Sequence, residues 1–195
     1  MRSFNVFTLC LAVVALAAMS FAPSSSPNKS IDPSKSQITW KGYKVLGEHS
    51  GTIQLSSVDL DMSDGVLKGG SFSIDMTSIK CTDLEGEYAG KLEGHLKSDD
   101  FFGVAKFPTA KFDITKVVSR GKAGNYKIVG NLTIKGITKE IRFNAETSGE
   151  GAMTAKITVD RSDFEVRYGS GSFFDNLGDK TIYDEFDLEV SIVNG

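Results

Sequence analysis

The stretch that decides the fold runs from Asp83 to Phe112 and reads DLEGEYAGKLEGHLKSDDFFGVAKFPTAKF. In its first half, apolar side chains recur every four residues, which is the spacing of one face of an α-helix. These side chains are Leu84, Tyr88, Leu92 and Leu96. The sequence therefore predicts one helix over residues 83–97, with Thr82 or Asp83 as its N-terminal cap.

On both sides of this helix the chain alternates apolar and polar residues, which is typical of strands with one buried face. Phe72, Ile74 and Met76 show this alternation clearly, because polar residues stand between them. Turn signals such as Ser63-Asp64-Gly65 separate the runs. The predicted strands cover residues 37–46, 52–60, 66–78, 111–118, 126–134, 138–147, 152–161 and 181–193.

About eight antiparallel strands in series favour an all-β, up-and-down barrel, because closure of the sheet removes its exposed edges. A barrel of this size can enclose one small ligand. The predicted helix falls between the third and fourth strands, where it would close one end of the barrel. A β-sandwich is the alternative architecture.

Three glycines interrupt the predicted helix, and each destabilises it by about 1 kcal/mol relative to alanine. Gly86, Gly90 and Gly94 share one helix face at a spacing of four residues. We expect a short helix that is held by packing, with a strand approaching closely on the glycine face.

The N-terminus has the pattern of a signal peptide. Arg2 precedes an apolar run over residues 6–18, which is too short to cross a bilayer well. Cleavage is predicted after Ser20 or Ala22, and an uncleaved membrane anchor is the alternative. The predicted organisation is a signal peptide over 1–22, a flexible linker rich in Ser and Pro over 23–36, and a barrel domain over 37–195.

Composition excludes several functions. The 195 residues carry a net charge of −3 and no basic cluster, which argues against nucleic acid as a partner. The sequence contains two histidines, His49 and His95, and no Cys/His cluster, so we predict no metal and no cofactor. Cys10 would leave with the signal peptide, and the remaining Cys81 is predicted to be buried and unpaired.

His95 is followed by a pair of carboxylates, Asp99 and Asp100. Paired carboxylates can divide the roles of general acid and base, so a hydrolase-type enzyme that uses these three residues is one alternative. A turn that caps the next segment also explains the two carboxylates, and it is the interpretation we favour. A second alternative is an interaction protein whose phenylalanines fill a packed core.

Three motifs in order resemble the signature of the YceI-like family. The first is His95-Leu-Lys-Ser-Asp-Asp-Phe-Phe102 followed by Phe107-Pro-Thr-Ala-Lys-Phe112. The second is Gly130-Asn-Leu-Thr-Ile-Lys-Gly-Ile-Thr-Lys139, and the third is Asp160-Arg-Ser-Asp-Phe164. The likeness runs from about residue 36 to residue 192. It departs from the usual pattern at Lys135, where the family often has His, and at Glu165, where it often has Gly.

The resemblance implies a lipocalin-like barrel that is exported to the bacterial periplasm or secreted, and that binds a ligand without catalysis. Its ligand would be a polyisoprenoid, such as an isoprenoid quinone precursor, or a fatty amide or acid, held in a tunnel. Barrels of this size also pair through a strand edge or an open end, so a homodimer is left open.

Candidate ligand contacts follow from the aromatic and in-phase apolar residues together with this resemblance. The predicted tunnel lining comprises Trp40, Phe72, Ile74, Leu96, Phe101, Phe102, Phe112, Ile114, Phe143 and Phe164. The candidates for the polar end of the ligand are His49, His95 and Lys135.

Overall fold

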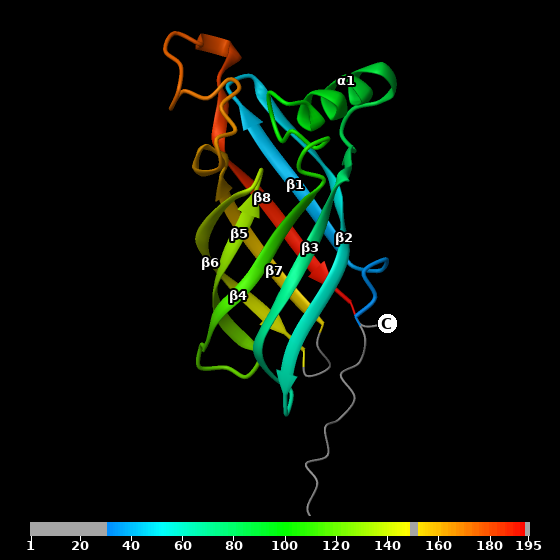
Figure 1. Cartoon of the computed structure of the whole chain (residues 1–195), viewed down its shortest axis with the longest axis vertical. Helices are drawn as coiled ribbons and strands as arrows, with labels where there is room; N and C mark the ends of the chain where they lie inside the picture. The colour runs from blue at the N-terminus through cyan, green and yellow to red at the C-terminus, as the bar shows by residue number, and fades with distance from the viewer. Residues whose placement is uncertain (1–30, 149–151, 194–195) are drawn as a thin grey trace, which may run out of the picture.

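The computed structural model describes residues 31–148 and 152–193. Eight strands form a closed barrel in which every pair is antiparallel and the last strand pairs with the first (Figure 1). The strands are β1 (Gln37–Lys44), β2 (Gly47–Ser63), β3 (Val66–Cys81), β4 (Thr109–Ser119), β5 (Asn125–Ile134), β6 (Ile137–Thr147), β7 (Met153–Asp160) and β8 (Ile182–Ile192). The predicted barrel and its number of strands are confirmed.

The helix α1 (Gly86–Lys97) lies between β3 and β4, as predicted, at the upper end of the barrel in Figure 1. It begins at Gly86 rather than at Asp83, and the side chain of Glu85 at its N-terminus makes no capping bond. The prediction of Thr82 or Asp83 as the cap is therefore wrong. None of the helices in the two described ranges is long and apolar enough to cross a membrane.

The helix packs against the barrel only in part. None of its residues is buried, and Tyr88, which belongs to the predicted apolar face, is 73% exposed. A Cβ atom added at Gly86, Gly90 or Gly94 would meet nothing within 4 Å. The predicted close approach of a strand to these glycines is therefore wrong, and α1 covers the barrel end with most of its surface exposed.

The strands are longer at the upper end than the sequence pattern indicates. Residues 47–51, predicted as a turn, belong to β2, and β1 pairs with β2 as far as Lys44 and Gly47. A Cβ atom at Gly51 would overlap both the carbonyl of Lys80 and the ring of Trp40. Glycine is needed there because it lets the Trp40 side chain cross β2 on the inner face.

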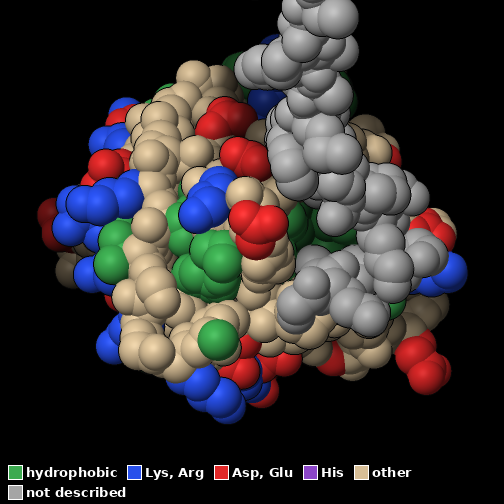
Figure 2. All heavy atoms as spheres, turned by 90° about the horizontal axis from the view of Figure 1, so that it is seen from below, with side chains coloured by type: hydrophobic (Ala, Val, Ile, Leu, Met, Phe, Trp, Pro, Cys, Tyr) green, Lys and Arg blue, Asp and Glu red, His purple; other side chains and the backbone are tan. Residues whose placement is uncertain are grey.

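The lower end of the barrel is filled by side chains. Leu67 and Tyr126 are buried there, and the Tyr126 hydroxyl accepts a hydrogen bond of 3.3 Å from the backbone N–H of Leu67. Figure 2 shows this end, where charged side chains surround apolar ones that are visible between the loops. The core thus closes the barrel below and leaves its upper half for a cavity.

Residues 31–36, the described part of the predicted linker, run beside the end of β8. The backbone N–H of Asp32 donates to the carbonyl of Val193, and the N–H of Val193 donates to Oγ of Ser36. Residues 1–30, which hold the predicted signal peptide, both cleavage sites and the rest of the linker, lie outside the described residues.

The segment between β7 and β8 covers the upper end beside α1 (Figure 1). It begins with the 3₁₀ helix η1 (Arg161–Phe164), whose first turn is capped by Asp160, and it ends with η2 (Gly178–Lys180). The Asp160 carboxylate accepts a hydrogen bond of 2.8 Å from the backbone N–H of Ser162. This cap turns the chain sharply inward after β7 and aims Arg161 at the barrel.

Candidate functional site

The barrel encloses an elongated apolar cavity. The cavity has a volume of about 170 Å³. Because this small volume is spread along side chains from all eight strands and α1, it indicates a narrow passage rather than a wide chamber. Its wall comprises Ile38, Trp40, Gly42, Tyr43, Ile53, Leu55, Phe72, Ile74, Met76, Ile79, Leu96, Phe101, Phe102, Ala110, Phe112, Leu132, Ile134, Ile141, Phe143, Met153, Ala155, Ile157, Arg161, Ile182, Tyr183, Phe186, Leu188 and Val190.

Strand alternation places most of these side chains, because every second residue of a barrel strand points inward. Of the ten residues predicted from sequence to line a tunnel, eight lie in this wall. They are Trp40, Phe72, Ile74, Leu96, Phe101, Phe102, Phe112 and Phe143. The strands carry five of the eight, while α1 and the loop after it supply Leu96, Phe101 and Phe102 at the upper end.

The other two predicted residues lie outside the wall. Ile114 is half-buried beside a register shift in the pairing of β4 with β5, and it packs against the surrounding core. Phe164 is fully buried in η1, which packs against β6 and β8. Both side chains support the barrel rather than facing the cavity.

The three predicted polar contacts also lie away from the cavity wall. Nδ1 of His49 is 2.9 Å from the Asp83 carboxylate, and Nζ of Lys135 donates to the carbonyl of Glu165. The His95 ring packs edge-on against Phe101 and Tyr168, and its Nε2 atom is buried with no hydrogen-bond partner among the described residues. None of the three belongs to the residues that line the cavity.

Five residues of the upper wall were missed by sequence reasoning: Tyr43, Arg161, Ile182, Tyr183 and Phe186. Phe186 follows the in-phase alternation of the last strand, so its inward direction could have been found. Arg161 lies within the third motif, but the motif alone gave this arginine no role. Tyr43 and Tyr183 depend on how the first strand meets the last, and no local pattern reports that.

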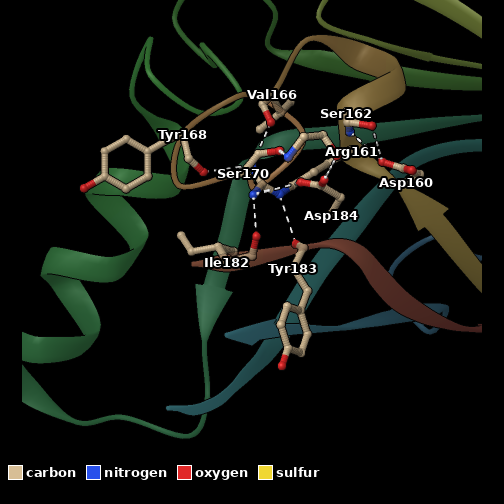
Figure 3. Close-up of polar contacts among 10 residues, drawn as sticks. Asp160, Arg161, Ser162, Val166, Tyr168, Ser170, Ile182, Tyr183 and Asp184 are labelled. Carbon is tan, nitrogen blue, oxygen red and sulfur yellow. Dashed lines mark hydrogen bonds and ion pairs between the residues drawn. The ribbon is translucent and has the colours of Figure 1, made fainter. Parts of the chain in front are cut away.

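Arg161 is a buried cation at the upper end of the cavity, where it is 2% exposed. It holds the segment after β7 against the start of β8 (Figure 3). Its guanidinium donates to four backbone carbonyls, those of Val166, Tyr168, Ile182 and Tyr183. Nη2 also lies 3.2 Å from the carboxylate of Asp184.

Four of the five N–H groups of the guanidinium thus donate to backbone carbonyls, and the Asp184 carboxylate lies close enough to Nη2 for an ion pair. Burial lowers the pKa of Arg161, and the neighbouring carboxylates of Asp184 and Asp160 raise it again. An arginine keeps its charge in proteins. Arg161 is therefore a structural clasp, because its hydrogen bonds go to the backbone of two separate segments of the chain.

The three sequence motifs meet at this end of the barrel. The guanidinium carbon of Arg161 lies 5.4 Å from the centre of the Phe101 ring, which joins the third motif to the first. A Cβ atom at Gly130 would overlap the Phe112 ring, so the second motif supplies the space that this ring occupies in the wall. The motifs thus build the upper half of the cavity and the loops that cover it.

The acid–base alternative has little geometric support. The Asp99 carboxylate lies 2.8 Å from Nζ of Lys106 at the surface, and Asp100 is exposed. Among the described residues, no hydrogen bond joins His95 to either carboxylate, and no group of three or more acidic, His or Cys side chains could hold a metal ion. Asp99 and Asp100 lie in a turn, in which the backbone N–H groups of Phe101 and Gly103 donate to the Ser98 carbonyl.

Solved structures of low sequence identity share the fold. BcnA of Burkholderia cenocepacia superposes with a TM-score of 0.67 at 20% identity, over 85% of this chain and all of that one. A polyisoprenoid binding domain from Saccharophagus degradans superposes with a TM-score of 0.58 at 13% identity, over 84% of this chain and 95% of that one. The YceI protein of Campylobacter jejuni gives a TM-score of 0.53 at 18% identity, over 100% and 99% of the two chains.

Curated bacterial relatives match over shorter stretches. A UPF0312 protein of Photorhabdus laumondii is 40% identical over 74 residues, which are 38% of this chain and 37% of the relative. A UPF0312 protein of Vibrio campbellii is 32% identical over 107 residues, 50% of this chain and 56% of the relative. The chain thus spans between about a third and just over half of the length of these relatives. A family profile of the YceI-like domain matches residues 30–194, and the chain belongs to that family.

Proposed function

We propose that this chain is an exported, non-enzymatic carrier that holds one long apolar ligand, such as a polyisoprenoid, inside the barrel. The observation that carries the proposal is the narrow cavity, whose wall is apolar along nearly its whole length. Such a passage fits a single hydrocarbon chain better than a compact substrate. The polyisoprenoid binding domain from Saccharophagus degradans, which shares the fold, supports the same ligand class.

The apolar wall alone provides enough free energy for binding. Each buried methylene contributes about 0.8 kcal/mol, so a tail with roughly fifteen buried carbons gains on the order of 12 kcal/mol. Association costs of about 4 to 15 kcal/mol offset much of that gain. At the low end of that cost the net gain is about 8 kcal/mol, which corresponds to micromolar affinity without an ion pair to the ligand. Export is supported by Arg2 and by the apolar run over residues 6–18.

Mass spectrometry of the purified protein tests the proposal. The full chain is expressed in a bacterium, recovered from the envelope fraction, and weighed under native conditions before and after organic extraction. We expect one apolar molecule per chain, with a mass in the polyprenyl or long-chain lipid range. Recovery from the cytoplasm alone would contradict the export part of the proposal.

A cavity-filling variant supplies the matched comparison. Ala155 lines the cavity and Ala105 is exposed in the loop before β4, so Ala155→Phe and Ala105→Phe make the same change in two places. We expect Ala155→Phe to keep the barrel's circular dichroism and lose the bound lipid, and Ala105→Phe to keep both. A folded Ala155→Phe protein that retains as much lipid as the natural chain would overturn the proposal.

A further inference from the structure

The strand pairing that closes the barrel is irregular at one place. Gly42 of β1 pairs with Phe186 of β8, and Lys44 pairs with Ile182. Two residue steps along β1 therefore oppose four along β8, so residues 183–185 bulge away from the regular ladder. A bulge of this kind re-aims side chains and interrupts backbone pairing.

The cavity meets the surface at this bulge. A groove on the outside of the barrel shares three wall residues with the cavity: Tyr43, Ile182 and Tyr183. Tyr183 is 51% exposed although it also lines the cavity, so at this point the wall is about one side chain thick. Tyr183 therefore lies between the two spaces, and exposed aromatic side chains change rotamer rapidly.

The groove is polar and acidic, in contrast to the cavity. Its lining includes three carboxylates, Asp184, Glu185 and Asp187, and no lysine or arginine from the described residues. Asp184 faces the Arg161 guanidinium at 3.2 Å, which offsets its charge. Asp187 and Glu185 are left as the net charge of the groove, because the partners of Asp187 are two hydroxyl groups, those of Thr158 and Tyr43.

Three cations on this side of the barrel already have partners. Arg161 donates four hydrogen bonds to backbone carbonyls and pairs with Asp184. Nζ of Lys41 lies 2.7 Å from the Glu48 carboxylate, and Nζ of Lys156 lies 2.7 Å from that of Glu189. An anionic ligand group in the groove would therefore meet carboxylates first, because no described lysine or arginine lines it.

We propose that the polar end of the ligand lies in this groove beside Tyr183, and that the groove takes neutral or positively charged head groups and rejects phosphates and carboxylates. The inference rests on the proposed function, because it assigns the head-group class of the same apolar ligand. The hydroxyl and carboxylate oxygens of the groove would accept hydrogen bonds from an alcohol, an amide or an amine. They would repel a phosphate through charge, and added salt would weaken that repulsion because the groove is open to water.

The test compares ligands that differ at one end only. Delipidated full-length protein is titrated with a polyprenol, the polyprenyl amine and the polyprenyl phosphate of the same tail length, each delivered in neutral detergent. The single tryptophan, Trp40, lines the cavity, so its fluorescence reports filling of the tail site for all three ligands. We expect the phosphate to bind at least tenfold more weakly than the alcohol at low salt, and the amine to bind at least as tightly as the alcohol.

Two charge-reversal variants test whether the groove causes the difference in affinity between the alcohol and the phosphate. Glu185→Lys places a cation in the groove, whereas Glu146→Lys makes the same change on an exposed position of β6 near the lower end. We expect Glu185→Lys to reduce the preference for alcohol over phosphate by about tenfold. Glu146→Lys should leave the preference unchanged.

The outcomes separate the two proposals. If none of the three ligands binds, the proposed function fails and this inference falls with it. If all three bind with equal affinity, or the phosphate binds best, the carrier function stands and the head-group assignment is wrong. An equal effect of Glu185→Lys and Glu146→Lys would also overturn the assignment, because the selection would then come from overall charge.

Discussion

The hydroxyl of Tyr43 in β1 donates a hydrogen bond of 2.7 Å to Oδ2 of Asp187 in β8, across the strand pair that closes the barrel. The other carboxylate oxygen of Asp187 accepts a bond of 2.6 Å from Thr158 in β7. The bonds from Thr158 and Tyr43 hold the pKa of Asp187 below its usual range. One carboxylate thus ties three strands together where the backbone ladder of β1 and β8 is irregular.

Removing the Tyr43 hydroxyl tests how much this tie contributes. We expect Tyr43→Phe to lower the free energy of unfolding by about 1 kcal/mol at pH 7, because one side-chain hydrogen bond is lost while the ring is kept. Urea unfolding followed by circular dichroism measures the change. Tyr88→Phe is the matched control, since that side chain is largely exposed on α1, and an equal loss in both variants would refute the role of the tie.

Gly51 marks the place where the Trp40 side chain crosses β2. A Cβ atom there would overlap the ring and the backbone of β3, so relief requires the strands to move. We expect Gly51→Ala to destabilise the barrel by about 3 kcal/mol, which is more than overpacking of a flexible site usually costs. Gly90→Ala makes the same change on the open face of α1 and should stabilise the protein by up to about 1 kcal/mol.

Thermal unfolding of these two variants gives the comparison directly. A lower midpoint for Gly51→Ala and a higher one for Gly90→Ala are expected. If Gly51→Ala unfolds at the same temperature as the natural chain, the strands near Trp40 are looser than the geometry indicates.

The barrel and the part of the cavity wall that the strands supply could be predicted from the sequence, because both follow from local alternation. Phe72 and Phe112 point inward by the same parity that identifies their strands, and their rings lie 6.1 Å apart inside the barrel. The helix followed from apolar residues four apart. Its glycine face was misread, since spacing alone does not tell whether a strand or open solvent faces a helix.

The upper part of the site could not be predicted because its contacts join distant segments. Tyr43 and Asp187 are 144 residues apart, and their meeting depends on a register shift that neither strand encodes locally. The partners of Arg161 are backbone carbonyls, which carry no sequence signal. His49 and Lys135 were chosen for their chemistry as head-group contacts, yet their strands and turns place them outside the cavity wall.

Asp83 gives a pH-dependent prediction. Burial raises the pKa of its carboxyl group, but hydrogen bonds from Cys81, His49 and the Ser50 backbone lower it more, to about 2 from 3.8. Because the folded-state pKa is the lower one, its stabilising contribution is complete above pH 4 and is lost as the pH falls from about 4 to about 2. After allowance for partial exposure, we expect a contribution of about 1 kcal/mol at neutral pH.

Asp83→Asn should therefore destabilise the protein at pH 7 and have progressively less effect as the pH approaches 3. Urea unfolding of both proteins between pH 7 and pH 3 measures this convergence. Asp113→Asn, at an exposed position of β4, should change stability little at any pH. A constant difference between Asp83→Asn and the natural chain across the range would contradict the assigned pKa.

Arg161 provides the sharpest test of the upper end, because its planar guanidinium reaches four carbonyls that a lysine cannot reach together. We expect Arg161→Lys to lower the free energy of unfolding by about 3 kcal/mol, since carbonyls and the Asp184 carboxylate lose partners in a buried place. Arg142→Lys, which alters an exposed pair with Glu140, should cost less than about 1 kcal/mol.

Ligand release and hydrogen exchange of the Arg161→Lys variant need not change together. If the clasp only fastens the segment between β7 and β8, an Arg161→Lys protein that still folds should release the proposed apolar ligand faster, while its barrel strands stay protected from hydrogen exchange. Exchange should then rise in residues 161–181 and at the start of β8. Loss of protection spread evenly over all eight strands would instead show that Arg161 stabilises the whole barrel and does not act as a local clasp.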